Sequence, residues 1–175
     1  MLVTSWFGST DLSRTTEAQR RVIAGVEDLL AQLQPARIDR AQTVVEWEGG
    51  ETWVKLVHDS EPWMEIRFVL SDGWVNFYGV MGHDEAYSVH PEPRDGWIAD
   101  TIDIVADLLQ STFTTESYTL RGKPWRELLT ISVPWDRGST QLMSPVSALP
   151  LGRWAKYAET RTASFECQGS RRRTD

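Results

Sequence analysis

Ten residues hold the densest group of chemically active side chains in the chain. The stretch GHDEAYSVHP, residues 82–91, contains two of the three histidines. Imidazole and carboxylate groups are the usual ligands of divalent transition metals, and they also transfer protons. These residue types suggest a metal or acid–base site, with His58 available as a third ligand. The candidates are His83, Asp84, Glu85, Tyr87 and His90.

The spacing of the two histidines argues against a preformed metal motif. A helical motif places its ligands at i and i+4, whereas His83 and His90 are seven residues apart, and Pro91 and Pro93 oppose a helix there. Three interpretations stay open: a metal site folded from a loop, a proton-transfer role for His83 or His90, and a solvated acidic connection. We expect the connection, with no bound metal and no cofactor.

Other catalytic signatures are missing from the sequence. It contains no G-x-S-x-G elbow, no S-x-x-K pair and no glycine-rich phosphate loop. The single cysteine, Cys167, can form no intrachain disulfide and lies near Phe165 in a strand-like run, where a buried, inert thiol is the ordinary expectation. A nucleophilic Cys167 with a distant histidine is the alternative. We predict no catalytic residue and a protein that is not an enzyme.

The composition limits the kinds of partner. The net charge of −7 disfavours nucleic acid and favours a basic or neutral protein partner. No signal-peptide pattern and no apolar run of about 20 residues occurs, so we expect a cytoplasmic protein without membrane association. Nine tryptophans are more than this length usually carries, and they require an explanation.

Two amphipathic helices are predicted. Thr16 and Gln19 form a capping-box pattern before a helix that ends ahead of Pro35, and Asp95 can cap a second helix within residues 96–113. In the second helix, Asp100, Asp103 and Asp107 fall opposite the apolar residues. We expect these aspartates to face solvent, the alternative being a phosphate-like surface for a basic partner. The apolar positions are Val22, Val26, Leu29, Leu30 and Leu33, then Ile98, Ile102, Val105 and Leu109.

Two β-hairpins are predicted between the helices, with turns at Gly49-Gly50 and Asp72-Gly73. The first register places Trp47, Val45 and Thr43 opposite Thr52, Val54 and Leu56. The second places Ser71, Leu70, Phe68, Ile66 and Met64 opposite Trp74, Val75, Phe77, Gly79 and Met81.

This register buries one face and turns large aromatic and charged side chains to the other. Tryptophan, tyrosine and arginine are enriched in binding hot spots, so the reverse face is the candidate interface. Alternatively, the late strands, or the loop with Trp135 and Trp154, cover it as a second core. Its binding candidates are Trp53, Trp63, Glu65, Arg67, Trp74 and Tyr78, near Glu46, Lys55 and Asn76.

Three further strands are predicted at 115–121, 125–133 and 155–167, with a turn at 122–124 and a loop at 134–150. The order predicts an α+β two-layer sandwich, in which an antiparallel sheet of about six strands carries two main helices on one face. We expect a single domain over 1–168, followed by a disordered basic tail over 169–175.

This order of elements resembles small bacterial α+β proteins that bind other proteins, including immunity proteins of toxin systems and secretion-chaperone-like folds. The likeness is one of architecture only; the acidic charge, the tryptophan-rich face and the missing catalytic signatures predict a non-enzymatic protein-binding module, immunity-type or chaperone-like, in which the aromatic face supplies contact area. His83, Asp84, Glu85 and Tyr87 would supply polar selection at its rim. The alternatives are a small enzyme or ligand-binding protein with a His/acid site in the 82–91 loop, and a homodimer paired through the aromatic face.

Overall fold

A computed structural model describes residues 5–8, 11–61, 63–71, 74–78, 86–87, 96–133, 139–143 and 156–171. The chain forms two compact units, unit 1 (Met1–Leu109 with Phe165–Asp175) and unit 2 (Gln110–Ser164). Unit 2 is therefore inserted between two parts of unit 1. The predicted α+β class is confirmed, but the described strands form two antiparallel sheets, of five and four strands, where one sheet of about six was expected.

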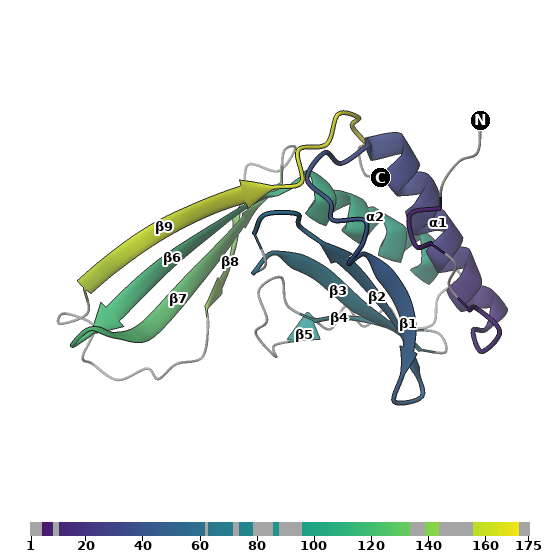
Figure 1. The fold of residues 1–175 in the computed structure, drawn as a ribbon, viewed down its shortest axis with the longest axis horizontal. Coiled ribbons are helices and arrows are strands. Elements are labelled where there is room, and N and C mark those ends of the chain that lie inside the picture. Colours follow the sequence, from purple (N-terminus) through teal and green to yellow (C-terminus); the bar gives the residue numbers. More distant parts are fainter. Residues whose placement is uncertain are drawn as a thin grey trace. The chain divides into compact units, whose positions relative to one another are not determined.

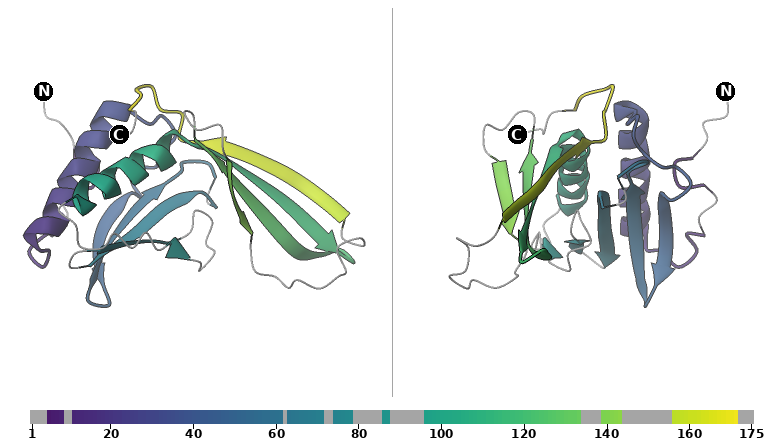
Figure 2. Two further views of the ribbon diagram at one scale, coloured as in Figure 1. Left: turned by 180° about the vertical axis from the view of Figure 1, so that it is seen from behind. Right: turned by 60° about the vertical axis from the view of Figure 1, so that its left-hand side comes forward.

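Unit 1 pairs one sheet with one helical layer. Its elements are α1 (Glu17–Leu33), β1 (Val44–Glu48), β2 (Glu51–Val57), β3 (Glu65–Ser71), β4 (Trp74–Tyr78), β5 (Ala86–Tyr87) and α2 (Trp97–Gln110). The strands follow the order β1-β2-β3-β4-β5, and both helices lie on the same face of the sheet (Figures 1 and 2). The short strand β5 lies within the predicted 82–91 connection. Neither helix in the described part of the chain is long and apolar enough to cross a membrane.

The predicted capping box begins α1 and also ties the helix to the sheet. The Thr16 side chain accepts from the Gln19 backbone N–H, and Gln19 Oε1 accepts from the Thr16 N–H at 2.9 Å. Gln19 is buried, and its Nε2 donates to the Leu70 carbonyl of β3 at 2.8 Å. The helix ends where Gln34 takes a left-handed conformation, one residue before Pro35.

Both predicted hairpin registers are confirmed over the strands described. Gly49 and Gly50 have the positive φ angles that the first turn requires. In the second hairpin the predicted pairs run from Ser71 opposite Trp74 to Phe68 opposite Phe77. The turn itself, and the pairings expected for Gly79 and Met81, lie outside the described residues.

The core lies between this sheet and the helices. On α2 the prediction was wrong for Asp103, which is only 6 % exposed and pairs with Arg171 at 3.2 Å, so a partner compensates its burial. Ile98 and Ile102 are only half-buried. The sheet contributes Val45, Val54, Leu56, Ile66, Phe68, Leu70, Val75 and Phe77, and the helices contribute Val22, Ile23, Val26, Leu29, Leu30, Leu33, Trp97, Val105, Ala106 and Leu109.

The segment after unit 2 completes unit 1. Phe165 is fully buried, and its carbonyl accepts from the Arg37 N–H. The Gly169 N–H donates to the Leu33 carbonyl at 3.0 Å. Residues 169–171, expected to be disordered, thus include two anchored positions, Gly169 and Arg171.

Unit 2 is a second antiparallel sheet. It contains β6 (Thr112–Leu120), β7 (Lys123–Ser132), β8 (Ser139–Met143) and β9 (Lys156–Ser164), in the order β8-β7-β6-β9. The β6–β7 turn is Arg121-Gly122, both with positive φ, and not the predicted 122–124. Strand β8 lies within residues 134–150, which were predicted to be a loop. The prediction missed this strand because alternation over so short a run is a weak signal.

Candidate functional site

The face of the five-stranded sheet opposite α1 and α2 carries the predicted aromatic and charged side chains. We call it the outer face. Alternation along the paired strands assigns its members, since each is bounded by neighbours that point to the helices. They are Val44, Glu46 and Glu48 of β1, Glu51, Trp53, Lys55 and Val57 of β2, Glu65, Arg67, Val69 and Ser71 of β3, and Trp74, Asn76 and Tyr78 of β4.

Two aromatic rings of this face meet over the central strand. Trp53 and Tyr78 come from β2 and β4, whose backbones are about 9.5 Å apart because β3 lies between them. Their ring centroids are nevertheless only 4.9 Å apart, so both side chains lean over β3. Val69 of β3, which pairs with Trp53, is accordingly fully buried.

Arg67 completes this cluster. Its guanidinium lies 5.4 Å from the Trp53 ring centroid and 5.9 Å from that of Tyr78, within the range of cation–π attraction. Its pairing partner on β4 is Tyr78, which explains the close approach. We call Trp53, Arg67 and Tyr78 the aromatic–arginine cluster. All three side chains are half-buried.

Charged side chains surround the cluster. Lys55 Nζ pairs with a carboxylate oxygen of Glu46, and Arg67 Nε lies 3.7 Å from Glu65 Oε1. Lys55 and Arg67 are also direct neighbours across β2 and β3, so these carboxylates offset a like-charge contact. On strands β1–β4 the outer face carries two cations, Lys55 and Arg67, and four carboxylates, Glu46, Glu48, Glu51 and Glu65.

Two buried polar atoms on this face have no hydrogen-bond partner among the described residues: Arg67 Nε and Asn76 Oδ1. The 3.7 Å separation from Glu65 is too long for a hydrogen bond to Nε. Buried polar groups in folded proteins are nearly always hydrogen-bonded, so two exceptions on one face call for a physical explanation.

The other predicted site residues divide into two groups. Trp74 is half-buried on the outer face, whereas Trp63 precedes β3 and donates its indole N–H to the carboxylate of Glu61. His83, Asp84, Glu85 and His90 lie outside the described residues, and Tyr87 is described only as the backbone of β5. The predicted rim therefore stays a prediction.

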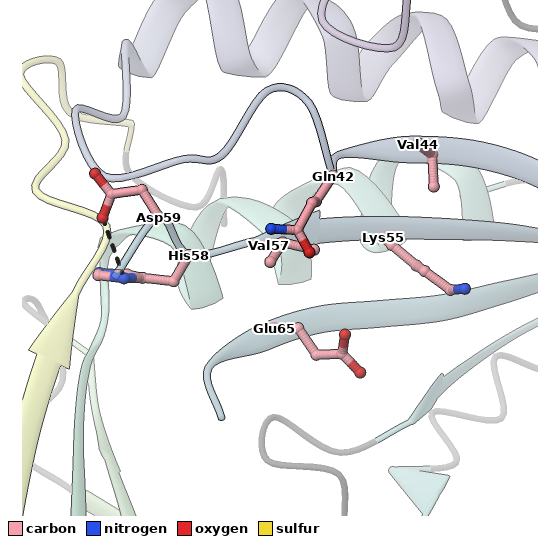
Figure 3. A pocket seen from close by; sticks show the side chains of 7 residues that line it. All are labelled: Gln42, Val44, Lys55, Val57, His58, Asp59 and Glu65. Atoms are coloured by element: carbon pink, nitrogen blue, oxygen red, sulfur yellow. Dashed lines mark ion pairs between the residues drawn. The ribbon is translucent and has the colours of Figure 1, made fainter. Parts of the chain in front are cut away.

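An open cavity of about 370 Å³ lies on the same side of the sheet, where β2 ends (Figure 3). His58 lies at its edge, with Nδ1 accepting the N–H groups of Ser60 and Glu61 at 3.3 and 3.1 Å. These bonds place the ring proton on Nε2 in the neutral form. The lining residues are Gln42, Val44, Lys55, Val57, His58, Asp59 and Glu65.

Sequence reasoning considered His58 as a metal ligand but missed the cavity. Asp59 Oδ1 lies 3.5 Å from the His58 Nδ1 and could have been noticed as an adjacent acid–imidazole pair. Gln42 and Val57 carry no such signal, because their role depends on where β2 ends. Among the described residues, no group of three or more His, Cys, Asp or Glu side chains is placed to hold a metal ion.

Cys167 is held in its unreactive form. The thiol is half-buried and donates to the Leu109 carbonyl at 3.4 Å. Burial raises the pKa of the thiol to about 11, so it stays protonated near neutral pH. Since the thiolate is the nucleophile, this environment does not activate Cys167.

The outer face thus combines two aromatic rings in contact, one guanidinium beside them and four carboxylates on strands β1–β4. No protein-family model, curated protein or solved structure matches the chain at a significant level.

Proposed function

We propose that the chain is a non-enzymatic protein-binding module whose outer face docks a basic or neutral protein, as an immunity-type inhibitor or a secretion chaperone would. The observation that carries this proposal is the aromatic–arginine cluster on the sheet face that neither helix covers. Within unit 1 the described elements bury the opposite face apart from Trp47, which is 39 % exposed, and leave Trp53 and Tyr78 only half-buried.

Such a cluster suits a binding hot spot. Tryptophan, tyrosine and arginine dominate the energetics of protein interfaces because they bury large areas while losing few rotatable bonds. The rings of Trp53 and Tyr78 pack against each other and lie beside the Arg67 guanidinium, so the three side chains form one contiguous group.

The charges indicate the kind of partner. The outer face has four carboxylates against two cations, and the whole chain has a net charge of −7. A basic protein is attracted to this surface and an acidic protein is repelled. Binding should therefore weaken as salt increases.

The test is capture of a partner by immobilised protein from a native lysate, followed by direct binding with the purified partner. Replacing both rings of the cluster, Trp53→Ala with Tyr78→Ala, is expected to weaken binding at least about a hundredfold, the range of a two-residue hot spot. The matched control is Trp47→Ala. Trp47 lies on the first hairpin, points to the other side of the sheet and is 39 % exposed.

Melting temperatures decide how a loss of binding is interpreted. Loss of binding in the double variant, with a cooperative melting transition retained and Trp47→Ala binding normally, supports the proposal. Unchanged binding in the double variant contradicts it. A collapse of the fold would assign the two rings to a second core, and the outer face would no longer be the interface.

The cavity beside His58 supports a second candidate, a ligand-binding protein or small enzyme. The specific observation is the placement of a buried imidazole and the Asp59 carboxylate at the edge of an open cavity. Metal analysis of the purified protein and an NMR titration of its three histidines test it. Absence of metal together with histidine pKa values near 6.5 would count against this candidate.

A further inference from the structure

The two unpartnered polar atoms of the outer face lie close to each other. Arg67 pairs with Tyr78 and Val69 pairs with Asn76, so Arg67 and Asn76 are diagonal neighbours on adjacent strands. Diagonal neighbours in an antiparallel pair are about 7–8 Å apart at their backbones, within joint reach of one ligand group. One atom is a donor and the other an acceptor.

The packing of neighbouring side chains explains why Arg67 Nε and Asn76 Oδ1 are shielded from solvent, but not why these two positions carry polar residues. Trp53 and Tyr78 meet over β3 beside Arg67, which shields its Nε from solvent. An apolar side chain would fill the same space without leaving an unsatisfied donor. A buried polar group without a partner destabilises the folded protein, and these two atoms have none among the described residues.

We propose that Arg67 and Asn76 are the specificity-determining polar residues of the outer face, and that they bind a main-chain peptide group of the partner. The partner carbonyl accepts from Arg67 Nε, and a partner N–H donates to Asn76 Oδ1. This inference rests on the proposed function and names the group of the partner that is recognised.

A neutral amide fits better than a charged group. The excess of carboxylates on the face disfavours a partner carboxylate beside Arg67, while Asn76 Oδ1 offers an acceptor without charge. An extended residue presents its own N–H and C=O on the same edge of the chain, as antiparallel strands show. One extended residue can therefore serve both atoms once the rings of the cluster move apart.

The direct test uses two small uncharged probes and NMR. N-acetylalanine N-methylamide has N–H and C=O groups, whereas its fully N-methylated analogue has only C=O groups. Both probes are expected to shift the Arg67 Nε–H resonance, and only the first is expected to perturb the Asn76 side-chain carbonyl. The first should bind about twofold to tenfold more tightly, the value of one hydrogen bond.

Asn76→Leu supplies the matched variant, since leucine has nearly the same shape without polar atoms. It should bind the two probes equally. It should also raise the melting temperature by about 2–4 °C, because an unsatisfied buried group is removed. Either a lower melting temperature or an undisturbed Arg67 Nε–H signal at saturating probe would overturn the inference.

The outcome separates this inference from the proposed function. If the Trp53 and Tyr78 replacements abolish binding of the partner but Asn76→Leu binds it normally, the outer face is the interface. The proposed binding of a peptide group by Arg67 and Asn76 is then wrong. If Asn76→Leu weakens binding of the partner and binds the two probes equally, both the proposed function and this inference are supported. If the probes bind as expected but the Trp53 and Tyr78 replacements still bind the partner normally, the amide-binding site is supported and the proposed docking function is contradicted.

Discussion

The two faces of the five-stranded sheet treat buried polar groups in opposite ways. On the helix side, Gln19 bonds to the Leu70 carbonyl and to Thr16, and Thr52 Oγ1 lies 3.4 Å from Gln19 Oε1. On the outer face, the atoms Arg67 Nε and Asn76 Oδ1 are buried within half-buried side chains and lack such bonds among the described residues. The same strands thus carry one face whose buried amide is hydrogen-bonded and one face with two polar atoms that lack a partner among the described residues.

This difference separates a polar group that supports the fold from two polar atoms that do not. A satisfied polar group inside a core fixes the register of helix on sheet, as Gln19 does between α1 and β3. An unsatisfied group destabilises the fold, which is why we propose a partner for Arg67 Nε and Asn76 Oδ1. Substitutions placed on each face test this difference.

The largest expected effect is at Phe68. It is fully buried on the helix side, with its ring centroid 5.1 Å from that of Phe77. Phe68→Ala should lower the free energy of unfolding by about 3–5 kcal/mol, because it deletes core contacts and leaves a cavity. Trp53→Ala, on the outer face, should cost less than about half of that, since the indole is already partly in water. Urea denaturation measures both, and equal costs would mean that both faces are cores.

A smaller effect, with a change of sign, is expected for buried amides. Gln19→Leu should lower the free energy of unfolding by about 1–3 kcal/mol, because it removes the hydrogen bond to the Leu70 carbonyl and disrupts the capping box. Asn76→Leu should raise it. Gln32→Leu is the control on α1, since Gln32 is exposed, and it should change stability by less than about 0.5 kcal/mol. Thermal melts of the three variants compare the signs directly.

The local structure of unit 1 could be predicted because its signals are local. The capping box, the glycine turn and alternation fix α1 and both hairpins, and the registers then assign the outer face. The sequence could not show that Trp53 and Tyr78 meet over β3, because that depends on side-chain conformations and not on register. It also could not show which polar atoms stay unpaired.

The long-range organisation was harder to predict for a physical reason. That unit 2 is inserted, and that Phe165 and Gly169 return to unit 1, depends on contacts between segments far apart in the sequence. Asp103 was assigned to solvent because helical periodicity alone does not reveal Arg171 as its partner. Patterns within one element place its faces, but a buried charge is decided by the rest of the chain.

The smallest expected effect concerns the ion pair between Glu46 and Lys55 on the outer face. The two side chains are 40 % and 26 % exposed, so solvent screens their attraction. A double-mutant cycle with Glu46→Gln and Lys55→Met should give a coupling of about 0.2–1 kcal/mol, shrinking in about 0.5 M salt. Removing Glu46 also leaves Lys55 beside Arg67 across the strands, so the single Glu46→Gln variant should be the less stable of the two. A coupling above about 2 kcal/mol that salt does not reduce would show that the pair is dehydrated as a core pair is, and the outer face would then be covered in the free protein.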